Sequence, residues 1–106
     1  MKLESEKDTE RYLVEQVEKI GGLCRKYTSP GVRGVPDRIC FFPEGHVYFV
    51  ELKSEGEAAT DHQLREHQRL FNVGTPVSVI DTKAGVDLLI DIIRRLYGIL
   101  RSIYRA

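Results

Sequence analysis

The chain has 106 residues, 42% of them hydrophobic and 30% charged, and its 16 basic residues balance its 16 acidic ones. This length suits one domain, residues 1–106, and the composition is that of a folded globular protein rather than a disordered one. A formal net charge of zero argues against a protein that binds nucleic acid by bulk electrostatics. It does not exclude nucleic-acid binding at a local site, where a metal ion bound by acidic residues would supply positive charge.

No apolar segment reaches the roughly 20 residues of a membrane span. The N-terminus is charged where a signal peptide needs an apolar stretch, so we expect a cytoplasmic protein without membrane contact. The two cysteines, Cys24 and Cys40, fall in predicted strands and have no partners at zinc-binding spacing. We therefore expect both to be buried, reduced thiols.

The first half of the chain predicts one helix and three strands. Ser5 caps the helix together with Asp8, and Gly21 ends it after apolar residues at helical spacing. The predicted strands span residues 23–27, 37–42 and 47–53. A four-residue turn, Pro43 to His46, joins the last two into a hairpin.

The second half predicts a helix, a strand and a long helix. Thr60 or Asp61 begins the middle helix, whose apolar positions are Leu64, Leu70 and Phe71. A strand follows at 77–80, and the last helix runs from about residue 83 to 104. The order α-β-β-β-α-β-α predicts an α/β fold with one mixed central sheet flanked by helices. The last strand follows a crossover helix and should lie parallel to its neighbour.

The last helix carries more apolar surface than a monomer of this size needs. One stripe suffices to dock it on the sheet, and a second stripe remains at Leu88, Ile92 and Ile99. Burial of both stripes within one chain is the alternative, but we expect the helix to contribute to a homodimer. The first stripe comprises Val86, Leu89, Ile90, Ile93, Leu96, Tyr97, Leu100 and Ile103.

Two acids and a lysine carry the chemistry. Asp37 follows a glycine-rich turn at the start of one hairpin strand, and Glu51 and Lys53 end the other strand after a gap of thirteen residues. Side chains alternate along a strand, so Glu51 and Lys53 share a face, and the hairpin brings Asp37 opposite them. Two carboxylates with the Leu52 carbonyl suit Mg²⁺, and Lys53 would stabilise developing negative charge. The alternative is a cross-strand salt bridge, but a surplus acid there is costly unless a cation binds.

These residues resemble a known nuclease family. Gly34-Val35-Pro36-Asp37 followed by Glu51-Leu52-Lys53 is similar to the PD-(D/E)xK signature. The segments at 21–27, 29–31 and 33–38, with Gln63, Leu70 and Gly74, resemble the VRR-NUC (virus-type replication-repair nuclease) domain over about residues 6–80. The resemblance is to stand-alone phage or prophage members, which would act in a bacterial or phage-infected cell. It implies a restriction-endonuclease-like core, Mg²⁺ or Mn²⁺ dependence, and cleavage of branched DNA such as four-way (Holliday) junctions or flaps.

The resemblance adds two site residues. In this fold an acid of the first helix often reaches the metal site, and Glu10 matches it, with Glu6 one turn earlier as the alternative. Gln63 matches a glutamine that orients groups near the active site. Both could instead be ordinary solvated helix residues.

The loop before Asp37 is a candidate for contacts with the DNA backbone. Its glycines let backbone N–H groups approach phosphate and Arg33 supplies a charged donor, although an ordinary turn would also need the glycines. His67, four residues after Gln63, shares its helix face and is a further candidate. A zinc site formed by His62, His67 and Asp61 is excluded, because the two histidines are five residues apart and do not share a helix face. The predicted DNA contacts are Lys26, Ser29, Gly31, Arg33, Gly34 and His67.

The sequence thus predicts a Mg²⁺-dependent, homodimeric endonuclease acting on branched DNA. The alternative is a nucleic-acid-binding or assembly module that keeps the fold without catalysis. Retention of Asp37, Glu51 and Lys53 together argues against that alternative.

Overall fold

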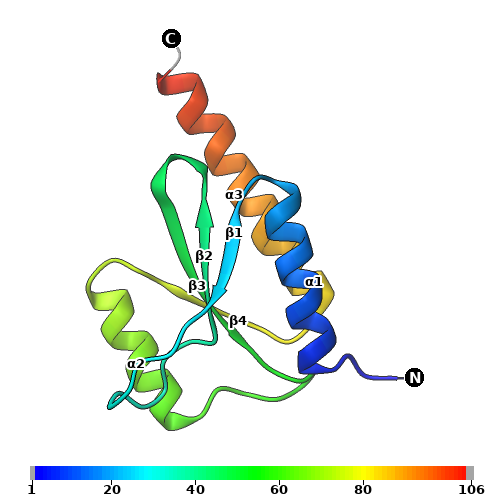
Figure 1. Ribbon diagram of the computed structural model, residues 1–106, viewed down its shortest axis with the longest axis vertical. Coiled ribbons are helices and arrows are strands. Elements are labelled where there is room, and N and C mark those ends of the chain that lie inside the picture. The colour runs from blue at the N-terminus through cyan, green and yellow to red at the C-terminus, as the bar shows by residue number, and fades with distance from the viewer. Residues whose placement is uncertain (1, 105–106) are drawn as a thin grey trace.

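The computed structural model describes residues 2–104, and side chains of residues 2–96. A four-stranded sheet in the order β1-β2-β3-β4 lies at the centre. Helices α1 and α3 pack against each other on one side of the strands, and α2 lies on the other side (Figure 1). The element order and the mixed sheet flanked by helices confirm the predicted α/β architecture.

The first helix, α1 (Glu6–Lys19), begins where the sequence predicts. Ser5 accepts a hydrogen bond from the backbone N–H of Asp8, which satisfies one of the free donors at the helix start. Leu13 and Val17 are fully buried at a spacing of four residues and attach the helix to the core.

The sheet has an antiparallel part and a parallel part. The antiparallel part consists of β1 (Leu23–Lys26), β2 (Arg38–Phe42) and β3 (His46–Leu52), in which each strand pairs with the next one along the chain. A short 3₁₀ turn, Pro43–Gly45, joins β2 to β3. Strand β4 (Val77–Ile80) pairs parallel to β3, as its crossover connection predicts. Its other edge is free in the sheet order of the described residues, so β4 is an edge strand.

The core lies between the sheet and the α1–α3 pair. Cys24 and Cys40 face each other directly across β1 and β2, and both are free, buried thiols, as the sequence predicts. The buried apolar side chains of this core are Leu13, Val17, Cys24, Cys40, Phe42, Val50, Leu52, Ile80, Val86, Leu89, Ile90 and Ile93.

The middle helix, α2 (Asp61–Asn72), does not pack through most of the apolar residues that mark it in the sequence. Leu64 is 53% exposed and Phe71 64% exposed, so these two do not enter the core. The more buried face of α2 carries Gln63, Glu66, His67 and Leu70, which is largely polar. The amphipathic pattern is inverted because this helix covers charged groups of the sheet rather than an apolar layer.

The last helix, α3 (Lys83–Tyr104), has one buried stripe and one exposed stripe. Val86, Leu89, Ile90 and Ile93 are buried, whereas Leu88 and Ile92 remain 61% and 45% exposed. Leu96, predicted to belong to the buried stripe, is exposed, because the helix extends past the sheet (Figure 1). The side chains of Tyr97, Ile99, Leu100 and Ile103 lie outside the described residues. Within the part that is described, no helix is both long and apolar enough to cross a membrane.

Candidate active site

The hairpin brings Asp37 and Glu51 together, as the strand pattern predicts. The last pair in the ladder is Arg38 with Val50, so Asp37 and Glu51 each lie one residue beyond that pair, on neighbouring strands. The Asp37 carboxylate accepts a hydrogen bond of 2.7 Å from the backbone N–H of Leu52, and the Asp37 carbonyl accepts one from Tyr27. These bonds fix Asp37 against the end of β3.

Glu51 is the most deeply buried charged side chain of the site. It is 2% exposed, and its Oε2 accepts a hydrogen bond of 2.9 Å from the Gln63 amide. Its Oε1 is buried without a hydrogen-bond partner, and Nε2 of His67 lies 3.7 Å from it. A buried oxygen that lacks a partner is costly, so this arrangement favours binding of a cation or a water molecule.

The surroundings of Glu51 disfavour its charged form. The pKa of Glu51 is raised to about 8, first by burial and then by a hydrogen bond and charge repulsion from Asp37. The positive charge of Lys53 acts in the opposite direction. Two carboxylates that share one proton are a common electrostatic feature of divalent-metal and acid–base sites.

Lys53 is 8% exposed and continues the strand beyond β3. Its backbone N–H donates to the carbonyl of Ile80, which extends the pairing with β4 by one residue. Its position two residues after Glu51 puts both side chains on the same face, and its charge acts on both Glu51 and Glu6. The predicted grouping of Asp37, Glu51 and Lys53 is present.

Gln63 is held by the start of its own helix. The side chain of Thr60 accepts from the Gln63 backbone N–H, and the Gln63 side-chain oxygen accepts from the Thr60 backbone N–H at 2.8 Å. This capping box uses the amide oxygen, so the amide nitrogen is free to donate to Glu51. The side chain is therefore oriented toward the carboxylate, in agreement with its predicted placement.

The two acids of α1 have different surroundings. Glu10 accepts a hydrogen bond of 2.8 Å from the Arg38 guanidinium and forms a salt bridge with it. Partial desolvation and then the charge of Asp37 raise the pKa of Glu6, and Lys53 lowers it. The charges of the site therefore reach Glu6, whereas Glu10 binds the residue after Asp37; the catalytic role predicted for Glu10 stays a prediction.

His67 lies on the same face of α2 as Gln63, as the sequence predicts, and is close to Glu51. Its side chain is 11% exposed, faces Glu51, and has its Nε2 buried without a hydrogen-bond partner. Burial lowers its pKa. The ring is thus placed to orient Glu51, and the contact with DNA predicted for His67 stays a prediction.

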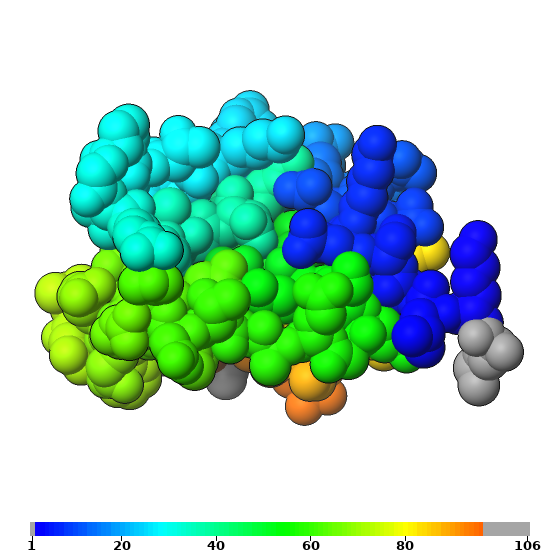
Figure 2. All heavy atoms as spheres, turned by 90° about the horizontal axis from the view of Figure 1, so that it is seen from below, coloured from blue at the N-terminus to red at the C-terminus, as the bar shows by residue number. Residues whose placement is uncertain are grey.

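The loop between β1 and β2 carries the remaining predicted DNA contacts. Lys26 ends β1 opposite Arg38, Ser29 forms a turn with Val32, and Gly31 and Arg33 are exposed. Viewed from below, the loop lies against α2, on the side of the molecule away from α1 (Figure 2).

The site fits a divalent cation held by two carboxylates. No group of three or more His, Cys, Asp or Glu side chains gathers as a metal cage among the described residues. Mg²⁺ needs fewer protein ligands because it retains several waters. The free buried oxygen of Glu51 and its raised pKa both suit such an ion, and the Leu52 carbonyl stays a predicted third ligand.

Sequence reasoning missed the basic residues of α2 next to this site. His62, Arg65 and Arg69 line a cleft with the loop at 31–33. Their spacing of three, four and seven residues puts them on one helix face, which is the signal that could have identified them.

Similarity to known proteins adds to this geometry. No family model matches the chain. It is 51% identical over 83 residues to the "Putative nuclease p44" of Acyrthosiphon pisum secondary endosymbiont phage 1, covering 78% of this chain and 89% of that protein. A solved structure described as "VRR_NUC domain" superposes with a TM-score of 0.78 at 38% identity, covering 83% of this chain and 96% of that one.

Proposed function

This chain belongs to the VRR-NUC family of nucleases, and from that premise we propose that it is a Mg²⁺-dependent endonuclease that cuts branched DNA. The observation that carries the proposal is the pair of adjacent acids, Asp37 and Glu51, with one carboxylate oxygen buried and unpartnered. A cation there would neutralise both acids, whereas no cationic group of the described residues is within hydrogen-bond distance of that oxygen.

Asp37 and Glu51 would hold the ion together with the Leu52 carbonyl. When bound, Mg²⁺ supplies Lewis-acid chemistry, neutralising the phosphate and lowering the pKa of a coordinated water. The hydrogen bonds from Leu52 and Gln63 each engage one oxygen of a carboxylate, and they restrict the rotation of both groups. Such orientation of ligands by neighbouring groups strengthens a metal site.

Lys53 would act on the phosphate. Its ammonium is on the same strand face as Glu51 and is largely withdrawn from water, where a positive charge stabilises developing negative charge more strongly than in solvent. Glu6 and Glu10 approach from α1, and either could position the attacking water.

A dimer would let the enzyme select branched DNA by geometry. Leu88, Ile92 and Leu96 of α3 and Val79 of the edge strand β4 are exposed apolar residues, and a groove of about 300 Å³ runs between α3 and β4. A second copy related by a two-fold axis would cover this surface and present two active sites to two strands.

Cleavage of labelled DNA tests the proposal. Purified protein incubated with Mg²⁺ and a four-way junction, a flap or a linear duplex should cut branched DNA faster than duplex. Chelation of the metal, or Asp37→Asn, should abolish cutting. Binding of the branched DNA without any cleavage in Mg²⁺ or Mn²⁺ would instead identify a non-catalytic binding module.

A further inference from the structure

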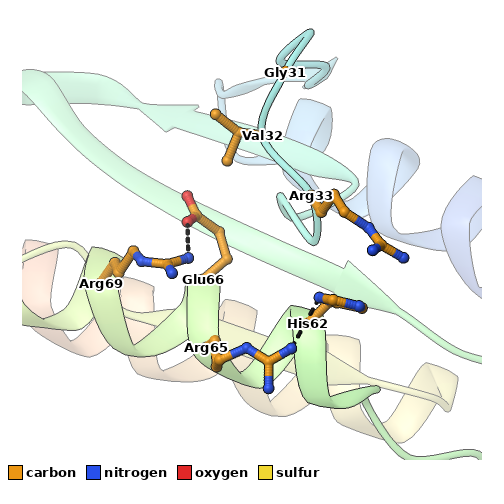
Figure 3. A pocket seen from close by; sticks show the side chains of 7 residues that line it. All are labelled: Gly31, Val32, Arg33, His62, Arg65, Glu66 and Arg69. Atoms are coloured by element: carbon orange, nitrogen blue, oxygen red, sulfur yellow. Dashed lines mark hydrogen bonds and ion pairs between the residues drawn. The ribbon is translucent and has the colours of Figure 1, made fainter.

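A cleft of about 500 Å³ lies beside the active site, between the loop at 31–33 and one face of α2. The loop forms one wall, where Val32 points toward Glu66 and Arg33 extends toward His62 (Figure 3). The opposite wall is α2, with Arg65 and Arg69 at its rim. The active-site carboxylates are not part of its lining, so the cleft is a separate feature.

The cleft has an excess of positive charge in a chain whose net charge is zero. Three guanidinium groups, those of Arg33, Arg65 and Arg69, line it with a single acid, Glu66. Planar guanidinium groups bind phosphate oxygens through paired N–H donors, which makes arginine the preferred residue for phosphate recognition.

Contacts along α2 orient two of the cations. A guanidinium nitrogen of Arg65 lies 2.9 Å from Nδ1 of His62. Because a guanidinium can only donate hydrogen bonds, Nδ1 is the acceptor, and in a neutral His62 the hydrogen is on the other ring nitrogen, Nε2. Arg69 donates to Glu66 at 3.2 Å, with its own side chain 66% exposed and that of Glu66 11% exposed. Glu66 thus restrains Arg69 from the helix side while leaving N–H groups available to a ligand.

The walls of the cleft are held at a fixed distance. Gly34 has a φ of +82°, and a Cβ there would collide with the backbone carbonyl of His62. The loop therefore contacts the first turn of α2 backbone to backbone, which only glycine permits. A cleft whose walls touch in this way is formed before any ligand arrives, so binding needs little reorganisation.

Each wall of the cleft is connected to a proposed metal ligand. Gly34 is three residues before Asp37, and Gln63, between His62 and Arg65 in sequence, donates to Glu51. A DNA strand with its scissile phosphate at Asp37 and Glu51 can continue along α2 into the cleft. The ligand that fits is a backbone phosphate of that same strand.

We propose that the cleft is a phosphate-binding subsite in which Arg33, Arg65 and Arg69 hold the DNA backbone next to the scissile position. The inference rests on the proposed nuclease function and deepens it. Because phosphate contacts position DNA without reading bases, the subsite would fix the register of cleavage and not its sequence preference.

The test is equilibrium binding of a labelled four-way junction to full-length protein carrying Asp37→Asn, so that the DNA stays intact. Fluorescence anisotropy at several salt concentrations gives the affinity and its salt dependence. Adding Arg65→Ala or Arg69→Ala should weaken binding roughly tenfold and reduce the slope of log K against log salt by about 0.9 for each phosphate that is no longer bound. The matched control is Arg11→Ala, an exposed arginine of α1, which should change neither.

A conservative variant separates phosphate binding from damage to the fold. Arg65→Lys keeps the charge and removes the planar fork, so it should keep most of the salt slope while binding the junction less tightly. Unchanged affinity and slope in both alanine variants, with the parent protein binding the junction, would overturn the subsite alone. Wild-type protein that binds junctions but cuts none in Mg²⁺ or Mn²⁺ would overturn the proposed function instead.

Discussion

The active site and the outer face of α3 depart from the ordinary pattern of burial in opposite directions. At the active site, the ionisable side chains of Glu51 and Lys53 are buried; on α3, the apolar side chains of Leu88 and Ile92 are exposed. Each arrangement is unfavourable for the isolated chain, since buried charge loses hydration and exposed apolar surface orders water. Under the proposed function, a cation and a phosphate would compensate the first region, and an apolar partner would cover the second.

The largest expected effect is loss of catalysis at the buried acids. Asp37→Asn or Glu51→Gln removes one proposed ligand charge while keeping the side-chain shape, so each should lower Mg²⁺-dependent cleavage by about a thousandfold or more, as loss of a central electrostatic group does. Initial rates on a labelled four-way junction measure it. Near wild-type rates in either variant would show that these acids are not the metal site.

Lys53→Ala should have the next largest effect. Loss of a cation that acts on the transition state should lower single-turnover cleavage on the order of a hundredfold. The affinity for DNA, measured with metal chelated, should change little. Weaker binding with an unchanged cleavage rate would assign Lys53 to DNA binding instead.

Ile92→Glu tests the exposed apolar face of α3. It puts a carboxylate at the centre of the exposed stripe of α3, where a dimer would have to bury it next to its copy. The variant should sediment as a 12.1 kDa monomer, whereas the parent should sediment as a dimer. Leu64→Glu, at a similarly exposed leucine of α2, is the control and should stay dimeric. A monomeric parent at micromolar concentration would exclude the dimer but not the nuclease.

The smallest expected effect is on stability, and it tests the buried carboxyl group of Glu51. The pKa of Glu51 rises from 4.5 to about 8 on folding, so between these values the folded chain binds a proton that the unfolded chain has released. Its contribution to the free energy of unfolding therefore falls as pH rises through this window, by at most about 1.4 kcal/mol per pH unit.

Glu51→Gln should remove this dependence. Thermal melts without metal at pH 5 and pH 8 should show the variant gaining relative to wild type at pH 8, by roughly 4–8 °C for each kcal/mol. Mg²⁺ should raise the melting temperature of the wild type at pH 8 and that of the variant much less. An equal difference between the two proteins at both pH values would contradict the buried, protonated Glu51.

Local sequence was sufficient for most of the fold. Alternating or helical apolar spacing, the Ser5 and Thr60 caps and the glycine and proline breaks located each helix and strand to within a few residues. The Asp37–Glu51 pairing also followed from sequence, because a hairpin with a short turn leaves few possible registers. These features depend on residues near each other along the chain.

Only the tertiary structure decided which way α2 faces and what surrounds Glu51. The apolar residues of that helix located it in the sequence but did not decide which face is buried. Leu64 and Phe71 are exposed, and the polar face carrying Gln63 and His67 covers the acid. The same packing sets the Arg65–Arg69 cleft against the loop through Gly34. Helix periodicity identifies a face but not its partner, since the partner is chosen by contacts between segments far apart in sequence.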